Sequence, residues 1–499
     1  MSGPDEQYDR NTRPDGYTPP TPAKRYNLVV IGAGPAGLVV AAAAASLGGK
    51  VALIERHRMG GDCLNVGCVP SKALIASARA AAAVRDGNEL GVGAAAPQID
   101  FPRVMERLRK LRAEISRADS VERFSGLGVD VFLGEGRFTG PDQVDVAGAS
   151  LKFARAAITV GSVPAIPDVP GLAAAGYETN LSIFNLTTRP ESLCVIGGGP
   201  IGCELAQAFA RLGTRVTLLQ RGARLLPRDD ADAAKIIHAR LEANGVNVVV
   251  NAKVVAASRL TDESRQISFE SASKQTQITC SKILVASGRR TELSALNLAA
   301  AKVKFDDHGV IVDDYLRTSN TNIYAAGDCC SGFKFTHAAD AMARLLIRNA
   351  LFFGRQRVSK LVIPWATYTD PEVAHVGLTV DEAAKKGVAV DVVTVDLRDV
   401  DRAVLDGTRD GFGRLVLRRG SDEILGATLV APHAGDMIPP IVLAMSNNLG
   451  AGALASSILP YPTIGEIWRK LGDAYNRTRL TPRSKGLLSS LLKWRRGGD

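Results

Sequence analysis

The sequence predicts an α/β fold with two Rossmann-like dinucleotide-binding domains and a further C-terminal domain. The first observation behind this prediction is an internal repeat. The segment from Ile31 to Arg56 aligns without a gap on the segment from Ile196 to Arg221, and each copy reads strand, glycine-rich turn, helix, strand. The second is length, because 499 residues exceed what one hydrophobic core accommodates, and about three domains are expected.

The glycines of each turn have separate tasks. The first makes the tight turn, the second lets a pyrophosphate approach the backbone at the helix N-terminus, and the third allows close packing of helix on strand. One such motif is a weak signal, because glycine-rich turns also occur for structural reasons, but two copies in complete βαβ frames are a strong one. The glycines are Gly32, Gly34 and Gly37 in the first copy and Gly197, Gly199 and Gly202 in the second.

The two copies differ where the second strand ends, at Glu55 and Gln220. A carboxylate there binds ribose hydroxyls, so Glu55 fits the unphosphorylated ribose of FAD. Gln220 does not repel a 2′-phosphate, and Arg221 and Arg224 follow it as candidate partners for that phosphate, which favours NADPH. NADH remains open, because Arg56 occupies the place of Arg221 in the first copy, where no 2′-phosphate is expected. Two different dinucleotides in one chain predict hydride transfer from nicotinamide to flavin.

Two cysteines, Cys63 and Cys68, lie shortly after the first copy in the stretch GGDCLNVGCVPSK. Pro70 fits the first turn of a helix, and a thiol at a helix N-terminus has a lowered pKa, so we expect reactive thiols. The alternatives are two buried apolar cysteines or a structural metal site. A metal site needs further Cys or His side chains nearby, and only His57 qualifies, so no metal site is predicted.

This stretch resembles the active-site signature of the class I pyridine nucleotide-disulfide oxidoreductases, the family of dihydrolipoamide dehydrogenase, glutathione reductase and mercuric reductase. Later landmarks follow in order up to about Pro482. ITVGS at 158–162 and ILVASGR at 283–289 resemble the domain-crossing segments, TNIYAAGD at 321–328 the second FAD motif, and YTDPEVA at 368–374 the start of the dimerisation domain. The resemblance implies an FAD-dependent enzyme that forms a homodimer through a C-terminal α+β dimerisation domain.

The expected domains follow from these landmarks and from composition. Residues 26–165 and 289–358 are the two parts of the FAD-binding domain, 166–288 the NAD(P)-binding domain, 359–482 the dimerisation domain and 483–499 a basic tail. Residues 1–25 are expected to be a disordered lead, because their first 24 residues are polar, rich in Pro and Gly, and lack the apolar core of a signal peptide. Without an uninterrupted apolar run long enough for a membrane span, we expect a cytoplasmic protein.

The resemblance also implies roles for individual residues. Cys68 would lie against the flavin as the charge-transfer thiol, and Cys63 would be the interchange thiol that meets the substrate. Lys72 and Glu204 would form an ion pair near the flavin, where the lysine charge stabilises the reduced ring. Independently of the family, a lysine soon after a cysteine helps to hold a thiolate.

Two carboxylates are expected beside FAD. By resemblance, Asp328 would bind the ribityl chain. Asp62 departs from the better-known members, which have threonine there, and an acid beside the FAD phosphates and Cys63 disfavours negative charge, so its orientation and protonation are open. Further cofactor-binding positions are Gly61, Gly136 and Gly288.

The substrate question depends on the C-terminal segment LPYPTIGE at 459–466. Disulfide-reducing members carry a His–Glu pair here, donated across the dimer interface, in which the His protonates the departing thiolate. Glu466 is retained but Tyr461 stands in place of the His, and a tyrosine with a pKa of about 10 is a poor proton shuttle at neutral pH. Mercuric reductase, by resemblance, also has tyrosine here, which suits a soft metal ion.

The leading interpretation is therefore a mercuric reductase-like enzyme that reduces a soft metal ion or a small thiol-reactive acceptor. The chain has no cysteine after Cys330, so the C-terminal pair that hands the metal inward is missing. The alternatives are a dihydrolipoamide dehydrogenase-like or other disulfide reductase, an NAD(P)H quinone or dye reductase, and a non-enzymatic redox-sensing or metal-sequestering flavoprotein. Cys329 and Cys330 could bind a soft cation, but packing beside the flavin is the favoured interpretation.

The net charge of +10 does not indicate a nucleic-acid partner. From Arg469 to Asp499 there are nine Lys and Arg against two Asp, which places +7 of the charge in this stretch and leaves the body nearly balanced. The tail, KGLLSSLLKWRR at 485–496, has apolar residues at near-helical spacing beside basic ones. This pattern is compatible with contact with an anionic membrane surface. A short helix that caps the dimer, or a solvated chain end, is the favoured interpretation.

Overall fold

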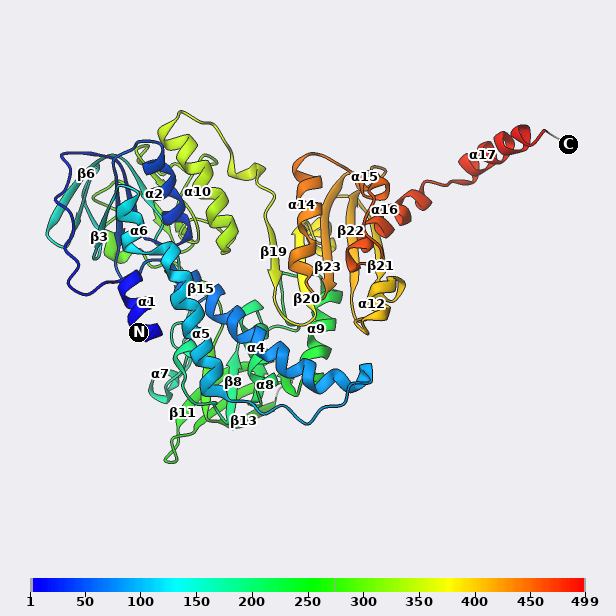
Figure 1. Cartoon of the computed structure of the whole chain (residues 1–499), viewed down its shortest axis with the longest axis horizontal. Helices are drawn as coiled ribbons and strands as arrows, with labels where there is room; N and C mark the ends of the chain where they lie inside the picture. The colour runs from blue at the N-terminus through cyan, green and yellow to red at the C-terminus, as the bar shows by residue number, and fades with distance from the viewer. Residues whose placement is uncertain (1–2, 273, 498–499) are drawn as a thin grey trace. The chain divides into compact units, whose positions relative to one another are not determined.

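The computed structural model describes residues 3–272 and 274–497 (Figure 1). The chain divides into two compact units. The first comprises the chain up to Ala83, Ala96–Arg221 and Val249–Leu361, and the second comprises Val84–Ala95, Gly222–Val248 and the chain from Val362 on.

A parallel sheet forms the centre of the first unit, with strand order β3-β2-β1-β6 and with β18 paired to β6. The two central strands, β1 and β2, are short apolar runs that are almost wholly buried, as expected of a sheet covered on both faces. Helices α2 (Pro35–Ser46) and α10 (Thr336–Leu351) contribute to one shared core beside it (Figure 1). The strands are β1 (Tyr26–Ile31), β2 (Val51–Glu55), β3 (Val129–Leu133), β6 (Ala149–Ile158) and β18 (Ile323–Ala325), and the first half of β6 pairs antiparallel with β5 (Gln143–Val146) and β4 (Arg137–Gly140).

The second copy of the repeat builds a further parallel sheet in the same unit, in which β8 lies between β9 and β14. A three-stranded antiparallel sheet of order β11-β12-β13 follows it along the chain. The elements are β8 (Ser192–Ile196), α8 (Pro200–Arg211), β9 (Arg215–Leu219), β11 (Lys253–Arg259), β12 (Arg265–Ser271), β13 (Lys274–Cys280) and β14 (Lys282–Val285).

The second unit contains a five-stranded antiparallel sheet of order β19-β20-β23-β22-β21. One hydrophobic core joins this sheet to α14, α15 and α16. The mixture of helices and antiparallel strands confirms the predicted α+β domain. The elements are β19 (Pro364–Thr367), β20 (Glu372–Gly377), β21 (Val390–Asp396), β22 (Phe412–Arg418), β23 (Ile424–Ala431), α12 (Asp401–Leu405), α14 (Pro439–Ser446), α15 (Ala451–Ser456) and α16 (Ile467–Thr478).

The N-terminal segment differs from the expected disordered lead. Residues Pro4–Thr12 form helix α1, with Pro4 in its first turn and acidic residues there that favour a helix N-terminus. Tyr8 is 6% exposed and Thr12 is fully buried against the rest of the first unit. The prediction of disorder from polar composition is wrong for this stretch, because one aromatic side chain docks the helix. Residues 1–2 lie outside the described residues.

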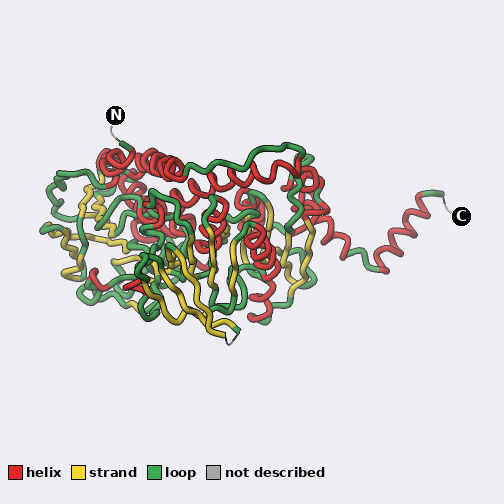
Figure 2. Tube along the Cα trace, turned by 90° about the horizontal axis from the view of Figure 1, so that it is seen from below, coloured by secondary structure: helices red, strands yellow, loops and turns green. Residues whose placement is uncertain are grey.

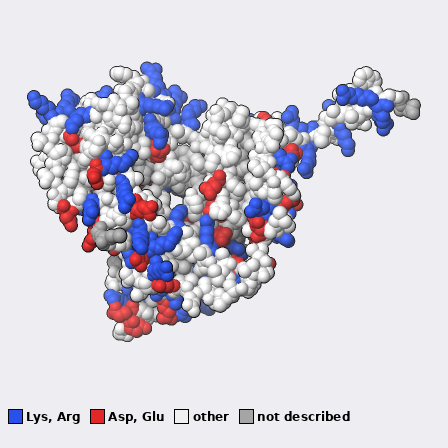
Figure 3. All heavy atoms as spheres, viewed as in Figure 1, with Lys and Arg blue, Asp and Glu red and all other residues white. Residues whose placement is uncertain are grey.

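The basic tail forms a helix, α17 (Pro482–Arg495), in which no residue is buried (Figure 2). Lys and Arg side chains follow it along the surface (Figure 3), and Leu487 and Trp494 are among its exposed apolar side chains. Within residues 3–272 and 274–497, no helix combines the length and apolar character needed to cross a bilayer.

Candidate active site

The two glycine-rich turns are built alike. At Gly32 the backbone has φ +103°, and an added Cβ would lie 2.6 Å from the carbonyl oxygen of Thr159. At Gly197 φ is +115°, and a Cβ would lie 2.4 Å from the carbonyl oxygen of Ala286. Both positions therefore require glycine for conformation as well as for space.

The other glycines of the turns have different surroundings. A Cβ at Gly37 would lie 1.8 Å from the Gly32 oxygen and one at Gly202 1.9 Å from the Gly197 oxygen, so both third glycines allow the close packing that the repeat predicts. Gly34 faces the backbone of Gly61, whereas a Cβ at Gly199 meets no atom within 4 Å.

Each turn is closed by the side chain at the end of the next strand. The Ala33 N–H donates to Glu55 Oε2 at 2.8 Å, and in the second copy the Gly198 N–H donates to Gln220 Oε1 at 3.0 Å. The His57 N–H also donates to Glu55, at 2.7 Å. Burial raises the pKa of Glu55, while the two backbone donors oppose that rise.

A cavity of about 60 Å³ lies beside Glu55. Gly136 is part of its wall, and a Cβ there would press on Ile54 and Ile31 at 3.2 and 3.3 Å. The cavity thus lies next to a carboxylate and a glycine-lined turn, the two features that the repeat places at a dinucleotide site. Its lining is Ile31, Gly32, Ile54, Glu55, Arg56, Gly134, Glu135, Gly136, Val160, Glu292, Ala295 and Leu296.

The cysteine pair lies where two helices meet. Cys63 is in the short helix α3 (Gly61–Asn65) and Cys68 is the first residue of α4 (Cys68–Asp86), and both thiols are free. A hydrogen bond from Cys63 is the main cause that lowers the pKa of Cys68 to about 6, with Thr336 and the charge of Lys72 adding to it. The same bond and burial raise the pKa of Cys63. Thr336 Oγ1 lies 3.5 Å from Cys68 Sγ, at the first turn of α10.

The expected ion pair is present in this geometry. Lys72 Nζ lies 2.8 Å from Glu204 Oε2, which joins the cysteine helix α4 to α8 of the second copy. Glu204 is buried at 5% exposure. A buried carboxylate requires such a partner, so the pair fixes the lysine one helical turn after Cys68.

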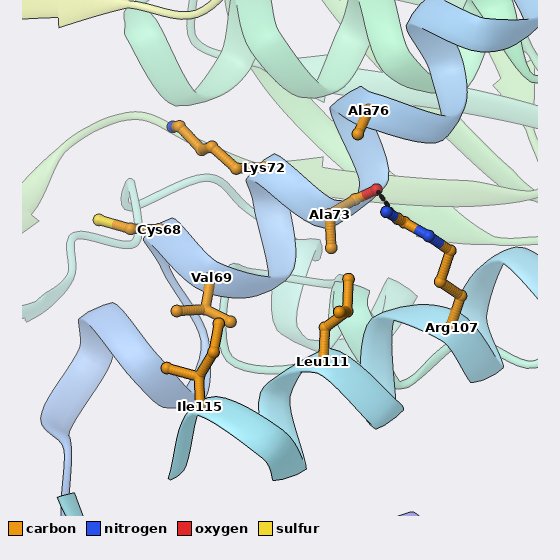
Figure 4. A pocket seen from close by; sticks show the side chains of 8 residues that line it. All are labelled: Cys68, Val69, Lys72, Ala73, Ala76, Arg107, Leu111 and Ile115. Atoms are coloured by element: carbon orange, nitrogen blue, oxygen red, sulfur yellow. Dashed lines mark hydrogen bonds between the residues drawn. The ribbon is translucent and has the colours of Figure 1, made fainter. Parts of the chain in front are cut away.

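A second cavity, of about 400 Å³, lies between the helices α4 and α5 (Phe101–Ile115). Figure 4 shows Cys68 and Lys72 on α4, with Leu111 and Ile115 on α5. Arg107 donates to the carbonyl oxygen of Ala73 at 3.1 Å and so ties the two helices together. The lining is Cys68, Val69, Lys72, Ala73, Ala76, Arg107, Leu111 and Ile115.

Asp62 has a partner that the sequence analysis missed. It forms an ion pair with Arg289, whose Nε donates to Ser162 Oγ at 2.7 Å. Ser162 in turn donates to Asp328 Oδ2 at 2.6 Å, and Arg289 Nε lies 3.8 Å from the same oxygen. Arg289 therefore balances both carboxylates expected beside FAD. The signal available in the sequence was its place directly after Gly288 in a domain-crossing segment.

Tyr461 and Glu466 lie in the second unit. Tyr461 is 69% exposed and its hydroxyl donates to Asp401 Oδ2 at 2.9 Å, a bond that raises the pKa of the phenol. Glu466 is buried and pairs with Arg469. Its Oε2 atom has no hydrogen-bond partner among the described residues. The tyrosine is thus oriented by Asp401, which sequence reasoning missed because the two residues are 60 positions apart.

The remaining predicted residues are more dispersed. Arg221 is exposed directly after Gln220, and Arg224 donates to the Pro227 carbonyl oxygen at 3.1 Å and lies 3.5 Å from Asp381. Gly288 has a positive φ of 129°.

The vicinal cysteines are packed against the backbone. Cys329 is fully buried and its thiol donates to the carbonyl oxygen of Ile158 at 3.3 Å. A hydrogen bond with Cys329 and burial raise the pKa of Cys330 well above its usual value. Over residues 3–272 and 274–497, no three His, Cys, Asp or Glu side chains are grouped to hold a metal ion.

Comparison with known proteins places these sites in a family. A model of the pyridine nucleotide-disulphide oxidoreductases matches residues 26–343, and the dimerisation-domain model of the same family matches residues 363–471. The chain belongs to this family. It is accordingly an FAD-dependent flavoprotein disulfide oxidoreductase that uses NAD(P)H, and the matched dimerisation domain supports a homodimer.

Relatives with different activities are similar to this chain. A mercuric reductase of Bacillus cereus is 35% identical over 442 residues, covering 88% of this chain and 70% of the relative. A dihydrolipoyl dehydrogenase of Chlamydia muridarum is 32% identical over 453 residues, covering 89% and 95%. The solved HOCl-induced flavoprotein disulfide reductase RclA of Escherichia coli is 27% identical with a TM-score of 0.79, covering 90% of this chain and 99% of that one, and a Cu(II) complex of RclA gives the same values.

Proposed function

We propose that this enzyme resembles mercuric reductase in its chemistry and reduces a soft metal ion or a small thiol-reactive acceptor through Cys63 and Cys68. The observation that carries the proposal is Tyr461, an exposed phenol whose pKa is raised by its bond to Asp401. Such a group stays protonated at neutral pH and exchanges protons poorly, whereas a disulfide acceptor needs a proton donor that titrates near neutrality. The similarity to mercuric reductases and to RclA with bound Cu(II) supports a metal acceptor.

In this proposal the two cysteines store the electrons and differ in protonation state. NAD(P)H and one proton convert the Cys63–Cys68 disulfide to two thiols and leave NAD(P)+, so two electrons are stored. Cys68, with a pKa of about 6, is then mostly thiolate at neutral pH, while Cys63 keeps its proton until an acceptor arrives. Passing both electrons to one mercuric ion gives neutral mercury, whereas two Cu(II) ions each take one electron and become Cu(I). Either reaction regenerates the Cys63–Cys68 disulfide and releases the two thiol protons to solvent. FAD, when bound, supplies the two-electron chemistry that connects nicotinamide to the thiols.

The chain's own groups hold the nucleotides in this proposal. The glycine turn at Gly32 and Gly34, the carboxylate of Glu55 and the wall at Gly136 would bind the adenosine diphosphate half of FAD, and Asp328 its ribityl chain. For the second nucleotide, Gln220 replaces the repelling carboxylate, and we propose NADPH as the preferred reductant. Its further contacts would come from Gly197, Gly199, Gly202 and Arg221.

The acceptor is small in this proposal. The cavity of about 400 Å³ beside Cys68 lies toward the lower end of the range of ligand pockets, and its walls from α4 and α5 include the cations Lys72 and Arg107. Cys63, the thiol expected to meet the acceptor, is not part of this lining. Soft ions and uncharged thiol-reactive molecules suit the cysteine pair, because they bind sulfur strongly.

Parallel reoxidation tests the acceptor. The enzyme is reduced anaerobically with NADPH or NADH and then mixed with mercuric ion, Cu(II), lipoamide, glutathione disulfide or a quinone. We expect the metal ions to reoxidise it fastest and NADPH to reduce it faster than NADH. Rapid reoxidation by lipoamide would overturn the proposed acceptor class. Quinone turnover that survives loss of both Cys63 and Cys68 would instead identify a quinone reductase.

A further inference from the structure

Helix α1 lies outside the residues that match the family, which begin at residue 26. It packs on α5 and on the segment of residues 58–65, which we call the redox loop because it carries Cys63 (Figure 1). The helix therefore reaches the cysteine pair from a part of the chain with no counterpart in the matched family model.

One side chain of α1 enters the redox loop. The Tyr8 hydroxyl donates to Asn65 Oδ1 at 2.6 Å, and Asn65 Nδ2 donates to the carbonyl oxygens of Arg58 and Met59 at 3.3 and 3.2 Å. Asn65 thus ties the end of the loop to its beginning, with Cys63 between them. Without the Tyr8 hydroxyl, the amide oxygen of Asn65 would lose its hydrogen-bond partner in a buried place, which destabilises this orientation of the loop.

Two guanidinium groups lie against the ring of Tyr8. The guanidinium carbons of Arg58 and Arg112 lie 4.9 and 4.3 Å from the ring centroid, distances typical of cation–π contacts. Arg112 also donates to the carbonyl oxygen of Asn65 at 3.3 Å. The hydroxyl is therefore delivered to Asn65 by a side chain that has little freedom to move.

Backbone contacts hold the same loop from two sides. On the outer side, the Met59 N–H donates to the carbonyl oxygen of Thr12 at 3.0 Å. On the inner side, the Gly60 N–H donates to the carbonyl oxygen of Ala33 in the first glycine turn at 2.9 Å. The loop is thus clamped between the FAD-binding turn and α1.

We propose that Tyr8 is a positioning residue for Cys63. Its hydroxyl fixes Asn65 and through it α3, and so sets how readily Cys63 reaches Cys68 to form or open the disulfide. This inference rests on the redox chemistry proposed above for the two cysteines. A disulfide tolerates only a narrow range of distances between its two cysteines, so a displacement of α3 changes the stability of the disulfide relative to the dithiol.

Removal of one oxygen atom tests the proposal. In the full-length holoenzyme, the Cys63–Cys68 dithiol–disulfide equilibrium is measured in glutathione redox buffers for the unaltered enzyme, Tyr8→Phe and Tyr17→Phe. Tyr17 is the matched control, because its hydroxyl donates to the Val131 carbonyl oxygen at 3.1 Å, away from the redox loop. We expect Tyr8→Phe to shift the equilibrium constant about tenfold, equivalent to about 30 mV, and Tyr17→Phe to leave it unchanged.

A double-mutant cycle shows whether Asn65 transmits the effect. Once Asn65→Leu has removed the acceptor, Tyr8→Phe should cause no further shift. An equilibrium unaffected by Tyr8→Phe, an equal shift in Tyr17→Phe, or additive shifts in the cycle would each overturn the role of Tyr8. Failure of the unaltered enzyme to form the disulfide at all would instead refute the proposed function.

Discussion

At the scale of single residues, the cysteine pair shows how one hydrogen bond moves the pKa values of two neighbouring thiols apart. The bond lowers the pKa of Cys68 and raises that of Cys63, because it stabilises the thiolate on one sulfur and the proton on the other. Thr336 and Lys72 act in the same direction on Cys68. The enzyme thereby keeps a thiolate and a thiol side by side at neutral pH.

Thiolate absorbance checks this separation. In the reduced enzyme, Cys68 should lose its proton as the pH rises through about 6, so the thiolate signal is absent well below that pH and complete above it. In Lys72→Gln the inflection should move up to about pH 7, because a neighbouring positive charge is lost. Lys282→Gln is the control, since Lys282 forms an ion pair of the same 2.8 Å length with Glu178. Equal inflections in both variants would contradict the role of Lys72.

The pair of Asp62 and Arg289 should govern FAD affinity. Arg289→Met leaves Asp62 uncompensated beside the expected phosphates, and we expect the FAD dissociation constant to rise about tenfold, from loss of a charge-assisted bond. Adding Asp62→Asn should recover most of that loss. Equilibrium dialysis of released FAD measures both changes. If the second substitution restores nothing, Arg289 binds FAD directly and compensation of Asp62 is not its task.

The identity of residue 461 should decide acceptor preference. Tyr461→His introduces a group that titrates near neutral pH, and general acid catalysis contributes about 10²- to 10⁴-fold where it is well placed. We expect turnover with lipoamide to rise about tenfold, because the new side chain lacks a tuned environment. Steady-state assays with lipoamide and mercuric ion measure the change, with Tyr461→Phe as the control. A rise in both variants would show that loss of the Asp401 bond, and not a proton donor, is responsible.

At the scale of elements, the close packing of α2 on β1 depends on Gly37. A Cβ there would lie 1.8 Å from the Gly32 carbonyl oxygen, so Gly37→Ala must displace the helix that starts the FAD site. We expect purified Gly37→Ala to have lost its flavin absorbance. Gly126→Ala is the control, because no atom lies within 4 Å of an added Cβ in helix α6 (Val121–Gly126). Retention of flavin in Gly37→Ala would refute close packing as the task of this glycine.

The elements also show which features a sequence can predict. Local patterns or an aligned motif predicted three features that the structure contains: the glycine turns, the helix after the cysteines, and the ion pair of Lys72 and Glu204. The pairing of Asp62 with Arg289 joins residues 227 positions apart, and no local pattern encodes it. Helix α1 was missed because its polar composition hides a single docking residue, Tyr8.

At the scale of the whole molecule, helix α17 adds charge but no buried surface. Truncation after Thr481 removes five Lys and Arg and one Asp, lowering the formal net charge from +10 to +6. We expect the thermal midpoint to change little, since exposed residues contribute within about 0.5 kcal/mol, and elution from a cation exchanger to come earlier. Light scattering of both forms is the further measurement. A truncated chain that becomes monomeric would show that α17 contributes to the dimer.

The two equivalent backbone hydrogen bonds that close the glycine turns bear on how each turn selects its own nucleotide. FAD and NAD(P)H share an adenosine diphosphate half, so each is a natural competitor for the other's site. The backbone bond is the same in both turns, to a carboxylate in Glu55 and to an amide in Gln220. If NADPH is the reductant, as proposed above, one exchange of oxygen for nitrogen would favour the 2′-phosphate in the second turn without remodelling either turn.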